Sequence, residues 1–499
     1  MSATTAADPI GTYVRGHAFK LLIGGELCDA ADGATLQTVD PSTGEALTSV
    51  PSAGAQDVAR AYEAAAAAQP DWEDIGVEGR SEVFSRLAAA IQANEERLAA
   101  LDAVDGGLPL AAARVDIKIS LANIRDWPTL VRWHGGRTIP ASPGNLHYTS
   151  YRPYGVVGKI LAYNHPAMFA ITRTLAALIA GNAVILKPAP QVPLSALALG
   201  EIARDVFPPG VFNVLTGGAE AGDAIVTHPA IKRIGFTGSV PTGLKIQQRA
   251  ATAAVKHVSL ELGGKNPMIV FPDADLDAAV DGAVSGMNFG VCAGQSCGSN
   301  SRNYVHGEIY DDFVSRVAER LEAMRVAPAY ADDVDMGPLV TREHYQRVMG
   351  FVRSGNEEGA RLVTGGDRPN GSTEDGGFFL RPTLFADVSP AMRVGREEIF
   401  GPVMAMASWD QTEEVIAAAN DTELGLTASV WTQDLTTAHR VASRLQAGYV
   451  WVNDTGRHYW GTPFGGAKNS GLGREESTEE YESYMELKAV HVILRGRGG

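Results

Sequence analysis

Short hydrophobic runs alternate with helix-like segments along the chain from about residue 183. The runs AVILK (183–187), FNVLT (212–216), IKRIGF (231–236) and VKHVSLEL (255–262) are rich in β-branched residues, and amphipathic segments such as VPLSALALGEIARDV (192–206) separate them. Strands that are joined by crossover helices form a parallel sheet with right-handed connections. We therefore predict a parallel α/β fold for this part of the chain.

The same alternation starts again near Pro267 and continues to about Trp451. PMIVF (267–271) is typical of a strand, residues 273–287 of a helix with acidic residues in its first turn, and residues 303–324 of a strand followed by a long helix. A chain of 499 residues is also too long for one ordinary core. Two parallel-sheet α/β domains fit both observations.

Two further segments are predicted to pair with each other as a small ribbon. Residues 131–155 are rich in Gly, Pro and aromatic side chains, and YMELKAVHVIL (484–494) alternates like an edge strand that must find a partner. We expect the ribbon to bridge domains or subunits. The predicted boundaries are 1–130 with 151–260 for the first domain, 261–465 for the second, and 131–150 with 480–499 for the ribbon.

Charge and composition narrow the kind of partner. Lys and Arg number 42 against 58 Asp and Glu, and a net charge of −16 argues against nucleic acid or an anionic membrane. The apolar run 167–186 contains Arg173 and a Gly-Asn break, so it predicts a buried helix, a turn and a strand, not a membrane span. The first twenty residues lack the apolar core of an export signal. A cytoplasmic protein that acts on a small molecule is the expectation.

The three cysteines define the candidate chemistry. Cys28, Cys292 and Cys297 are too few for a disulfide framework, and no second Cys pair or His cluster offers a set of zinc ligands, so no metal is expected. Cys297, in GQSCGSNSR (294–302), is either a buried apolar residue or a nucleophile, and Cys292 is a rival nucleophile in the same loop. A regulatory disulfide between these two cysteines is a further alternative.

A glycine-rich turn indicates where a phosphate would bind. FTGSVPTG (236–243) follows a predicted strand and precedes a predicted helix, so its backbone N–H groups are placed to receive a pyrophosphate at a helix N-terminus. Many such turns use Gly for backbone reasons alone, and the common GxGxxG fingerprint is absent from the chain. The turn by itself leaves a dinucleotide site open.

Seven motifs in one order carry a family resemblance. They are AYNHP (162–166), LKPAP (186–190), FTGS (236–239), LELGGKNP (260–267), GQSC (294–297), EEIFGP (397–402) and PFGGAKNSGLGRE (463–475). Together, over almost the whole chain, they closely resemble the aldehyde dehydrogenase superfamily. The resemblance implies a Rossmann-like cofactor domain, a catalytic domain and an oligomerisation ribbon, in a homodimer or homotetramer. The implied reaction is NAD(P)-dependent oxidation of an aldehyde to the free acid.

The resemblance also implies the catalytic roles. Cys297 matches the nucleophile that forms a thiohemiacetal and then a thioester, and Asn164 matches the side chain that stabilises the oxyanion together with the Cys297 N–H. Glu261 matches the general base that activates water for deacylation, and its presence speaks against acyl transfer to coenzyme A. Glu475 matches a second glutamate that has been considered a proton relay.

The cofactor residues follow from the same motifs. Lys187 and Glu398 match the residues that hold the two riboses, Phe400 packs near the nicotinamide, and Gly238 and Ser239 approach the pyrophosphate. Many NAD-preferring members carry a glutamate where this chain has Pro190. Because proline has neither charge nor side-chain acceptor, we expect NAD as the usual cofactor, with NADP accepted.

The aldehyde pocket is the part that the sequence determines least. Matching the family's pocket positions predicts an aromatic and partly basic wall made of His165, Phe169, Thr172, Phe289, Ser296, Arg457, His458, Tyr459 and Trp460. This wall suits an aromatic aldehyde, or a semialdehyde whose carboxylate meets Arg457. Two other functions remain open. One is a cysteine hydrolase that pairs Cys297 with His165 or His257. The other is a silent binding member of the fold, although such a member is expected to lose Cys297, Glu261 or Asn164.

Overall fold

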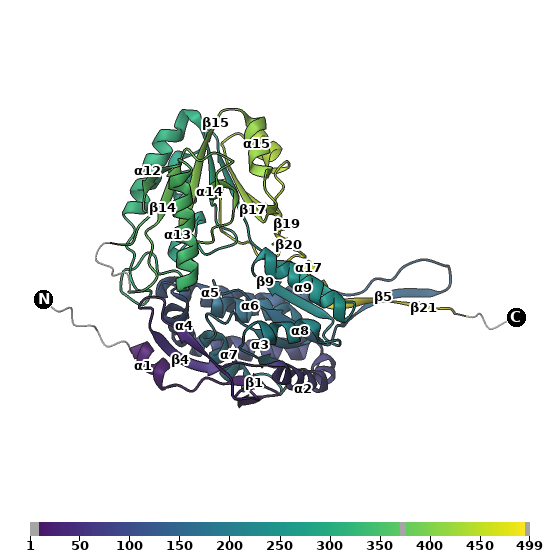
Figure 1. The fold of residues 1–499 in the computed structure, drawn as a ribbon. Helices are drawn as coiled ribbons and strands as arrows, with labels where there is room; N and C mark the ends of the chain where they lie inside the picture. Colours follow the sequence, from purple (N-terminus) through teal and green to yellow (C-terminus); the bar gives the residue numbers. More distant parts are fainter. Residues whose placement is uncertain (1–8, 370–375, 495–499) are drawn as a thin grey trace.

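The computed structural model of the chain describes residues 9–369 and 376–494. Two large sheets carry helices on their faces, and a two-stranded ribbon extends away from the body (Figure 1). The ends of the predicted segments 1–130 and 480–499 fall outside the described residues. The parallel α/β architecture predicted from the alternation of runs is confirmed.

The first sheet has eight strands in the order β2-β1-β8-β7-β6-β9-β10-β20. Its centre is parallel and consists of β8 (Phe212–Val214), β7 (Ala183–Lys187), β6 (Val156–Ile160), β9 (Arg233–Thr237) and β10 (His257–Glu261). Its edges are antiparallel and consist of β1 (Leu21–Ile23), β2 (Glu26–Cys28) and β20 (Gly471–Leu472). The four strands predicted between residues 183 and 262 are all present, with ends that differ from the prediction by at most two residues.

Long helices cover both faces of this sheet and bury its central strands. Every residue of β6, β7 and β9 is buried, which is the pattern of a parallel sheet covered on two sides. The helices are α2 (Ala55–Asp74), α3 (Gly76–Ala93), α4 (Glu95–Gly106), α5 (Leu110–Val131), α6 (Pro166–Ile179), α7 (Leu194–Arg204), α8 (Ala219–Thr227) and α9 (Val240–Ala253). A short helix α1 (Pro9–Gly16) and the antiparallel pair β3 (Thr35–Val39) and β4 (Ala46–Pro51) lie N-terminal to them in the chain.

The apolar run 167–186 folds as its composition predicts. It forms most of α6, a turn at Gly181 with φ of 96°, and most of β7. Among residues 9–369 and 376–494, no helix combines the length and the apolar character needed to cross a bilayer.

The second sheet has seven strands in the order β13-β14-β15-β12-β11-β17-β18. Only β13 (Arg361–Thr364) is antiparallel to its neighbour; the parallel strands are β14 (Thr383–Ala386), β15 (Val403–Trp409), β12 (Arg302–His306), β11 (Pro267–Val270), β17 (Thr427–Trp431) and β18 (Tyr449–Val452). Its helices are α10 (Leu276–Gly286), α11 (Phe289–Cys292), a 3-10 turn η1 (Gly307–Ile309), α12 (Tyr310–Glu322), α13 (Arg342–Glu357), α14 (Arg393–Arg396), α15 (Thr412–Asn420) and α16 (Leu435–Ala442). This sheet has its own hydrophobic core.

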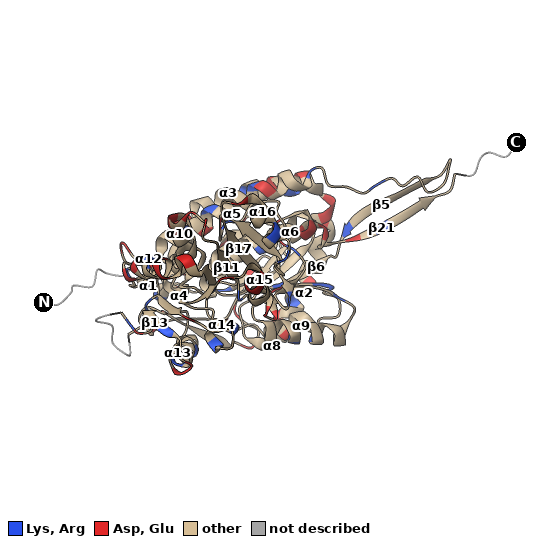
Figure 2. Cartoon of the chain, turned by 90° about the horizontal axis from the view of Figure 1, so that it is seen from above, with Lys and Arg blue, Asp and Glu red and all other residues tan. Residues whose placement is uncertain are grey.

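The ribbon is formed by β5 (Leu146–Pro153) and β21 (Met485–Val492), which pair antiparallel over their full length. Figure 2 shows it leaving the body in a second view as well. Before the ribbon, the C-terminal part of the chain adds β19 (Ala467–Lys468), which pairs with β16 (Leu424–Gly425), then β20 and α17 (Thr478–Glu482). The chain therefore returns to the first sheet through β20 before it enters the ribbon.

Candidate active site

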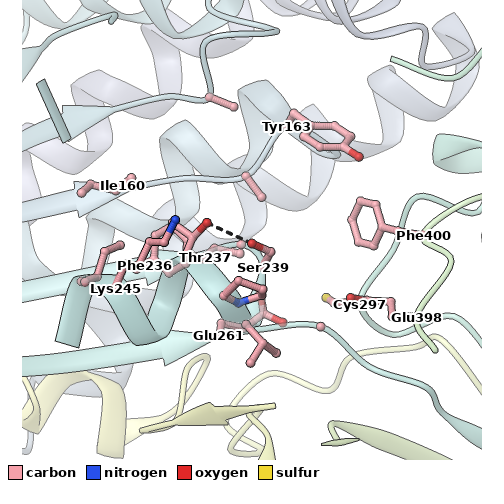
Figure 3. A pocket seen from close by; sticks show the side chains of 18 of the residues that line it. Ile160, Tyr163, Phe236, Thr237, Ser239, Lys245, Glu261, Cys297, Glu398 and Phe400 are labelled. Carbon is pink, nitrogen blue, oxygen red and sulfur yellow. Dashed lines mark hydrogen bonds between the residues drawn. The ribbon is translucent and has the colours of Figure 1, made fainter. Parts of the chain in front are cut away.

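One cavity of about 1120 Å³ lies at the carboxyl ends of the strands of the first sheet. Most of the predicted catalytic and cofactor residues line it, namely Asn164, Lys187, Pro190, Gly238, Ser239, Glu261, Cys297, Glu398 and Phe400. Figure 3 shows Cys297, Glu398 and Phe400 towards one end of the cavity and Ile160, Phe236 and Lys245 towards the other. Ligands bind at this edge of parallel sheets because successive strands end there.

Strand ends explain why residues far apart in the sequence meet. Lys187 is the last residue of β7, Glu261 is the last residue of β10, and Gly238 follows β9 directly. The short connection from β10 to β11 then carries the chain from the first sheet into the second. The loop that holds Cys297 precedes β12, the parallel neighbour of β11, so the thiol is delivered to the same place from the second sheet.

Cys297 is held by contacts to its backbone. Asn266 Nδ2 donates hydrogen bonds to Cys297 O (2.7 Å) and to Ser299 O (2.9 Å), which fixes the loop to the connection between the sheets. Burial raises the pKa of the Cys297 thiol well above its usual range, and the neighbouring Glu261 carboxyl raises it further. The thiol therefore needs a proton acceptor before it can react as a thiolate.

Glu261 is the carboxyl group that lies beside the Cys297 thiol and could accept its proton. The side chain is buried, and its Oε1 has no hydrogen-bond partner among the described residues. Burial raises the pKa of Glu261 to about 8, and the negative charge of Glu475 raises it as well. A carboxyl group with this pKa exchanges protons near neutral pH, as a general base must.

Glu475 does not line the cavity but lies in a buried ion pair. Arg173 Nη1 on α6 lies 2.7 Å from Glu475 Oε2, and both side chains are largely excluded from solvent. From the sequence alone, Arg173 was interpreted only as a charge that argues against a membrane span. Its pairing with Glu475 is a property of the fold.

Asn164 is buried and lines the cavity just before α6 begins. The start of this helix is fixed from α4, because Asp102 Oδ2 accepts a 3.0 Å hydrogen bond from the Ala167 N–H. Burial raises the pKa of Asp102 to about 7. The amide of Asn164 is thereby placed at the same cavity as the Cys297 thiol.

The other end of the cavity has the features of an anion-binding site. Ser239 precedes α9, and its Oγ hydrogen-bonds Thr242 Oγ1 at 3.0 Å (Figure 3), so no side chain caps the backbone N–H groups of the first turn. A side chain at Gly238 would collide with the Phe236 ring. Lys187 is buried, and burial lowers the pKa of its ammonium group to about 8. These residues fit a dinucleotide with its pyrophosphate at the start of α9.

Glu398 and Phe400 come to the cavity from the second sheet's side. Glu398 Oε1 accepts a 2.9 Å hydrogen bond from the Gly264 N–H, and a Cβ at Gly263 would overlap the Glu398 carboxylate. Phe400 has a left-handed backbone with φ of 58° and packs edge-on to Tyr163 with ring centroids 5.6 Å apart. Glycine at residue 263 therefore lets the carboxylate approach the chain.

Three aromatic residues that the pocket prediction did not include pack against Cys297. Tyr449, Trp451 and Phe464 form a buried cluster with Leu426, and Cys297 contacts this cluster. Tyr449 and Trp451 are two residues apart on β18 and therefore lie on the same face of the strand, which its sequence pattern could have predicted. Phe464 lies within the motif 463–475 that carried the family resemblance.

The nine predicted pocket residues lie outside the lining of the cavity. His165 Nδ1 bonds Asp116 Oδ2 at 2.8 Å, and its ring packs on Phe169; Thr172 Oγ1 donates to Met168 O at 2.8 Å. Ser296 Oγ accepts from Asn288 Nδ2 at 3.2 Å, and Phe289 is buried in the core of the second sheet. In the late loop, Arg457 is exposed over the Tyr459 ring, Trp460 packs edge-on to Trp127, and His458 packs on Phe464.

The structure also places the cysteine and histidine residues on which the alternative functions depend. Cys292 and Cys297 are both free thiols. The charged neighbours of the Cys297 thiol are Glu261, Glu398 and Arg173. His165 is engaged with Asp116, and His257 lies at the opposite end of β10 from Glu261. Among the described residues, no group of three or more His, Cys, Asp or Glu side chains is arranged to hold a metal ion.

A half-buried thiol, a carboxyl group and an amide beside a dinucleotide-sized cleft are the features of enzymes that oxidise a carbonyl substrate through a covalent intermediate. The model of the aldehyde dehydrogenase family matches residues 28–490, and the chain belongs to this family. It is 42% identical to aldehyde dehydrogenase tropH of Talaromyces stipitatus over 467 residues, which cover 92% of this chain and 90% of that protein.

Solved structures are similar over nearly the whole length. An NAD⁺ complex of an aldehyde dehydrogenase from Bacillus cereus has a TM-score of 0.94 and 38% identity, covering 98% of this chain and 99% of that one. A betaine aldehyde dehydrogenase from Staphylococcus aureus in complex with NAD⁺ has a TM-score of 0.92 and 32% identity, covering 97% of this chain and 96% of that one. The family and the fold predicted from the motifs are therefore confirmed.

Proposed function

We propose that this enzyme oxidises an aldehyde to the free carboxylic acid through a thioester on Cys297, with NAD as its usual cofactor. One observation carries the proposal. The Cys297 thiol, the Glu261 carboxyl and the Asn164 amide line the same cavity as Lys187 and Glu398, the two residues proposed to hold the cofactor riboses.

The first step is addition of the Cys297 sulfur to the aldehyde carbon. Glu261 takes the thiol proton, because its carboxyl group is the acceptor that lies beside the sulfur. The carbonyl oxygen becomes an oxyanion, which accepts hydrogen bonds from Asn164 Nδ2 and from the Cys297 N–H. These donors are fixed before the substrate arrives, since α6 and the loop 293–301 are both anchored by hydrogen bonds.

Residues of both sheets hold the cofactor. The pyrophosphate would bind at the start of α9 beside Gly238 and Ser239, Lys187 and Glu398 would hold the two riboses, and Phe400 would pack near the nicotinamide. The chemistry that NAD supplies when bound is acceptance of the hydride that the substrate carbon releases. Pro190 lies in the lining close to Lys187 and offers no charge against a 2′-phosphate, so NADP is also accepted.

Deacylation completes the reaction. After acylation, Glu261 releases the thiol proton to solvent and then removes a proton from a water molecule. The resulting hydroxide attacks the thioester carbon, the tetrahedral intermediate breaks the C–S bond to give the carboxylic acid, and the released Cys297 thiolate takes the proton that Glu261 holds. The buried Glu475–Arg173 pair lies next to Glu261 and influences its pKa without entering the cavity.

An uncharged aromatic aldehyde is the substrate class that we favour. Cys297 packs against the buried cluster that contains Tyr449, Trp451 and Phe464, and aromatic side chains beside the nucleophile suit an aromatic substrate. The nearby buried cation Arg173 is already paired with Glu475 and Glu476, and Arg457 is exposed and stacked on Tyr459. Neither arginine is therefore positioned as a dedicated partner for a carboxylated semialdehyde.

The ribbon is proposed as the oligomerisation segment of a homodimer or homotetramer. Leu146, Leu487 and Val492 on β5 and β21 are exposed apolar side chains on an element that extends from the body (Figure 1). Exposed apolar side chains on a projecting ribbon favour contact with a second copy of the chain. Sedimentation of the Leu487→Asp variant tests this, since the proposal requires a smaller assembly than the wild type.

Two variants test the catalytic assignment. Cys297→Ala is expected to abolish NADH formation while NAD still binds, and Glu261→Gln is expected to give a burst of NADH followed by a stall at the acyl-enzyme. Cys292→Ala is the matched control and is expected to remain active. Loss of activity in Cys292→Ala together with retained activity in Cys297→Ala would assign the nucleophile to the other cysteine.

A further inference from the structure

The buried Arg173 guanidinium is shared between two consecutive carboxylates. Its Nη1 lies 2.7 Å from Glu475 Oε2 and 3.4 Å from Glu476 Oε1. Arg173 is buried, and its guanidinium lies 4.9 Å from the centre of the Phe169 ring, so water screens these charges little. One cation between two carboxylates leaves one negative charge to be balanced by another group.

His458 contacts the second carboxylate from the late loop. His458 Nδ1 lies 2.8 Å from Glu476 Oε2, and the imidazole packs on Phe464 with ring centroids 4.5 Å apart. Phe464 belongs to the aromatic cluster that contacts Cys297. The connected side chains Glu475, Arg173, Glu476 and His458 therefore link the neighbour of Glu261 to the aromatic cluster that contacts Cys297.

We propose that His458 and Glu476 are positioning residues for deacylation, because their pairing decides how much of the Arg173 charge is available to neutralise Glu475 beside Glu261. A hydrogen bond from His458 stabilises the charge of Glu476 and leaves Arg173 to Glu475. Without His458, Glu476 competes for Arg173, and Glu261 faces a less compensated Glu475. The inference rests on the proposed role of Glu261 as the base that activates water.

Several other charged groups act on Glu261 and on the carboxylates near it. Glu261 is influenced by Glu475, Cys297, Arg173 and Glu398. Glu480 on α17 is buried, and its Oε2 accepts a 2.7 Å hydrogen bond from the Glu476 N–H; burial and Glu475 raise the pKa of Glu480 to about 7, while Lys159 and Arg173 lower it. The imidazole of His458 is partly exposed to solvent, and its other contacts are with the rings of Tyr449, Trp451 and Phe464.

Variants of the two residues are expected to act in opposite directions. His458→Gln leaves Glu476 uncompensated, so the pKa of Glu261 rises and deacylation requires a higher pH. Glu476→Gln removes the competing carboxylate, so Arg173 serves Glu475 alone and deacylation proceeds at a lower pH. The shift in Glu476→Gln should be about one pH unit, as expected for the loss of one charge at an effective dielectric constant of about 20, and the shift in His458→Gln, which loses a hydrogen bond, should be smaller. The double variant should behave like Glu476→Gln, because His458 then has no carboxylate to hold.

Hydrolysis of p-nitrophenyl acetate measures this without the cofactor. The burst of p-nitrophenol reports acylation of Cys297, and the steady rate after the burst reports deacylation, so its pH profile gives the midpoint directly. The exposed residues His439 and Glu414 supply the matched controls His439→Gln and Glu414→Gln, whose midpoints should equal that of the wild type. A general loss of stability would not shift the midpoints of His458→Gln and Glu476→Gln in opposite directions.

The outcomes separate the inference from the function on which it rests. Opposite shifts in His458→Gln and Glu476→Gln support it, and shifts of the same sign or of less than a few tenths of a pH unit overturn it. If Glu261→Gln deacylates as fast as the wild type, Glu261 is not the base, and the proposed function and the inference both fail. If Glu261→Gln is slow and the His458 and Glu476 variants do not shift, only the inference fails.

Discussion

Glu398 Oε1 accepts a 2.9 Å hydrogen bond from the backbone N–H of Gly264. Glu398 lies in the loop between α14 and β15, and the bond holds its carboxylate against the segment that connects β10 to β11. The adjacent residue, Gly263, has no side chain in the space that the Glu398 carboxylate fills. The carboxylate proposed to hold the nicotinamide ribose is thus fixed by backbone that passes between the two sheets.

Gly263→Ala should weaken cofactor binding because the added methyl group displaces the Glu398 carboxylate. Loss of one charge-assisted hydrogen bond predicts a dissociation constant for NAD that is about tenfold higher, measured by quenching of tryptophan fluorescence. Gly350→Ala on α13 is the control, since its Cβ would meet only Arg353 at 3.8 Å. Unchanged NAD binding in Gly263→Ala would show that Glu398 has no part in holding the cofactor.

Deacylation should depend on pH through Glu261. Burial raises the pKa of this carboxyl to about 8, and only the deprotonated form removes a proton from water. The rate should therefore fall about tenfold per pH unit below the midpoint and level off above it. Single-turnover hydrolysis of a preformed acyl-enzyme between pH 6 and pH 10 measures the midpoint. A profile that is flat across pH 7 to 9 would contradict a base in this environment.

The same raised pKa predicts a pH-dependent effect on stability. The unfolded chain releases the Glu261 proton near the ordinary glutamate pKa, whereas the folded protein keeps it until about pH 8, so rising pH between these values favours unfolding. Glu261→Gln removes this dependence. Its melting temperature should match the wild type near pH 4.5 and exceed it by a few degrees, on the order of 2–4 °C, at pH 8. A difference in melting temperature that does not grow with pH would argue against a buried, protonated Glu261.

The features that the sequence predicted best are those with local patterns. β7 is five buried apolar or amphipathic residues in a row, and its predicted bounds 183–187 agree with the structure. β20 has only two residues, Gly471 and Leu472, and pairs with β10 through long-range contacts, so no periodicity could reveal it. Cys297, Glu261 and Asn164 were found by motif and do line one cavity. The ion pair of Arg173 with Glu475 was not foreseen, because a helix residue and a distant loop residue meet only after both sheets have formed.

The aromatic wall at Cys297 predicts a preference among aldehydes. Benzaldehyde should show a kcat/KM about fivefold above that of hexanal, because stacking against the cluster of Tyr449, Trp451 and Phe464 contributes about 1 kcal/mol beyond burial. Phe464→Leu should reduce this ratio, whereas Arg457→Ala should leave the rate with a carboxylated semialdehyde within about twofold, as expected for an exposed charge. A large loss with the semialdehyde alone in Arg457→Ala would instead assign Arg457 to carboxylate recognition.

Cofactor choice should depend on Pro190, which lines the cavity in the segment that follows β7. A glutamate there would accept hydrogen bonds from the adenosine ribose hydroxyls and repel a 2′-phosphate, whereas proline does neither. In the wild type, the buried ammonium group of Lys187 partly neutralises that phosphate, so NADP should be used measurably. Pro190→Glu should widen the preference for NAD about fivefold, in line with roughly 1 kcal/mol for one such charge interaction. Steady-state kcat/KM values with both cofactors measure the ratio, and Pro190→Ala controls for loss of the proline ring. If the ratio is the same in Pro190→Glu and Pro190→Ala, another part of the cavity selects the cofactor.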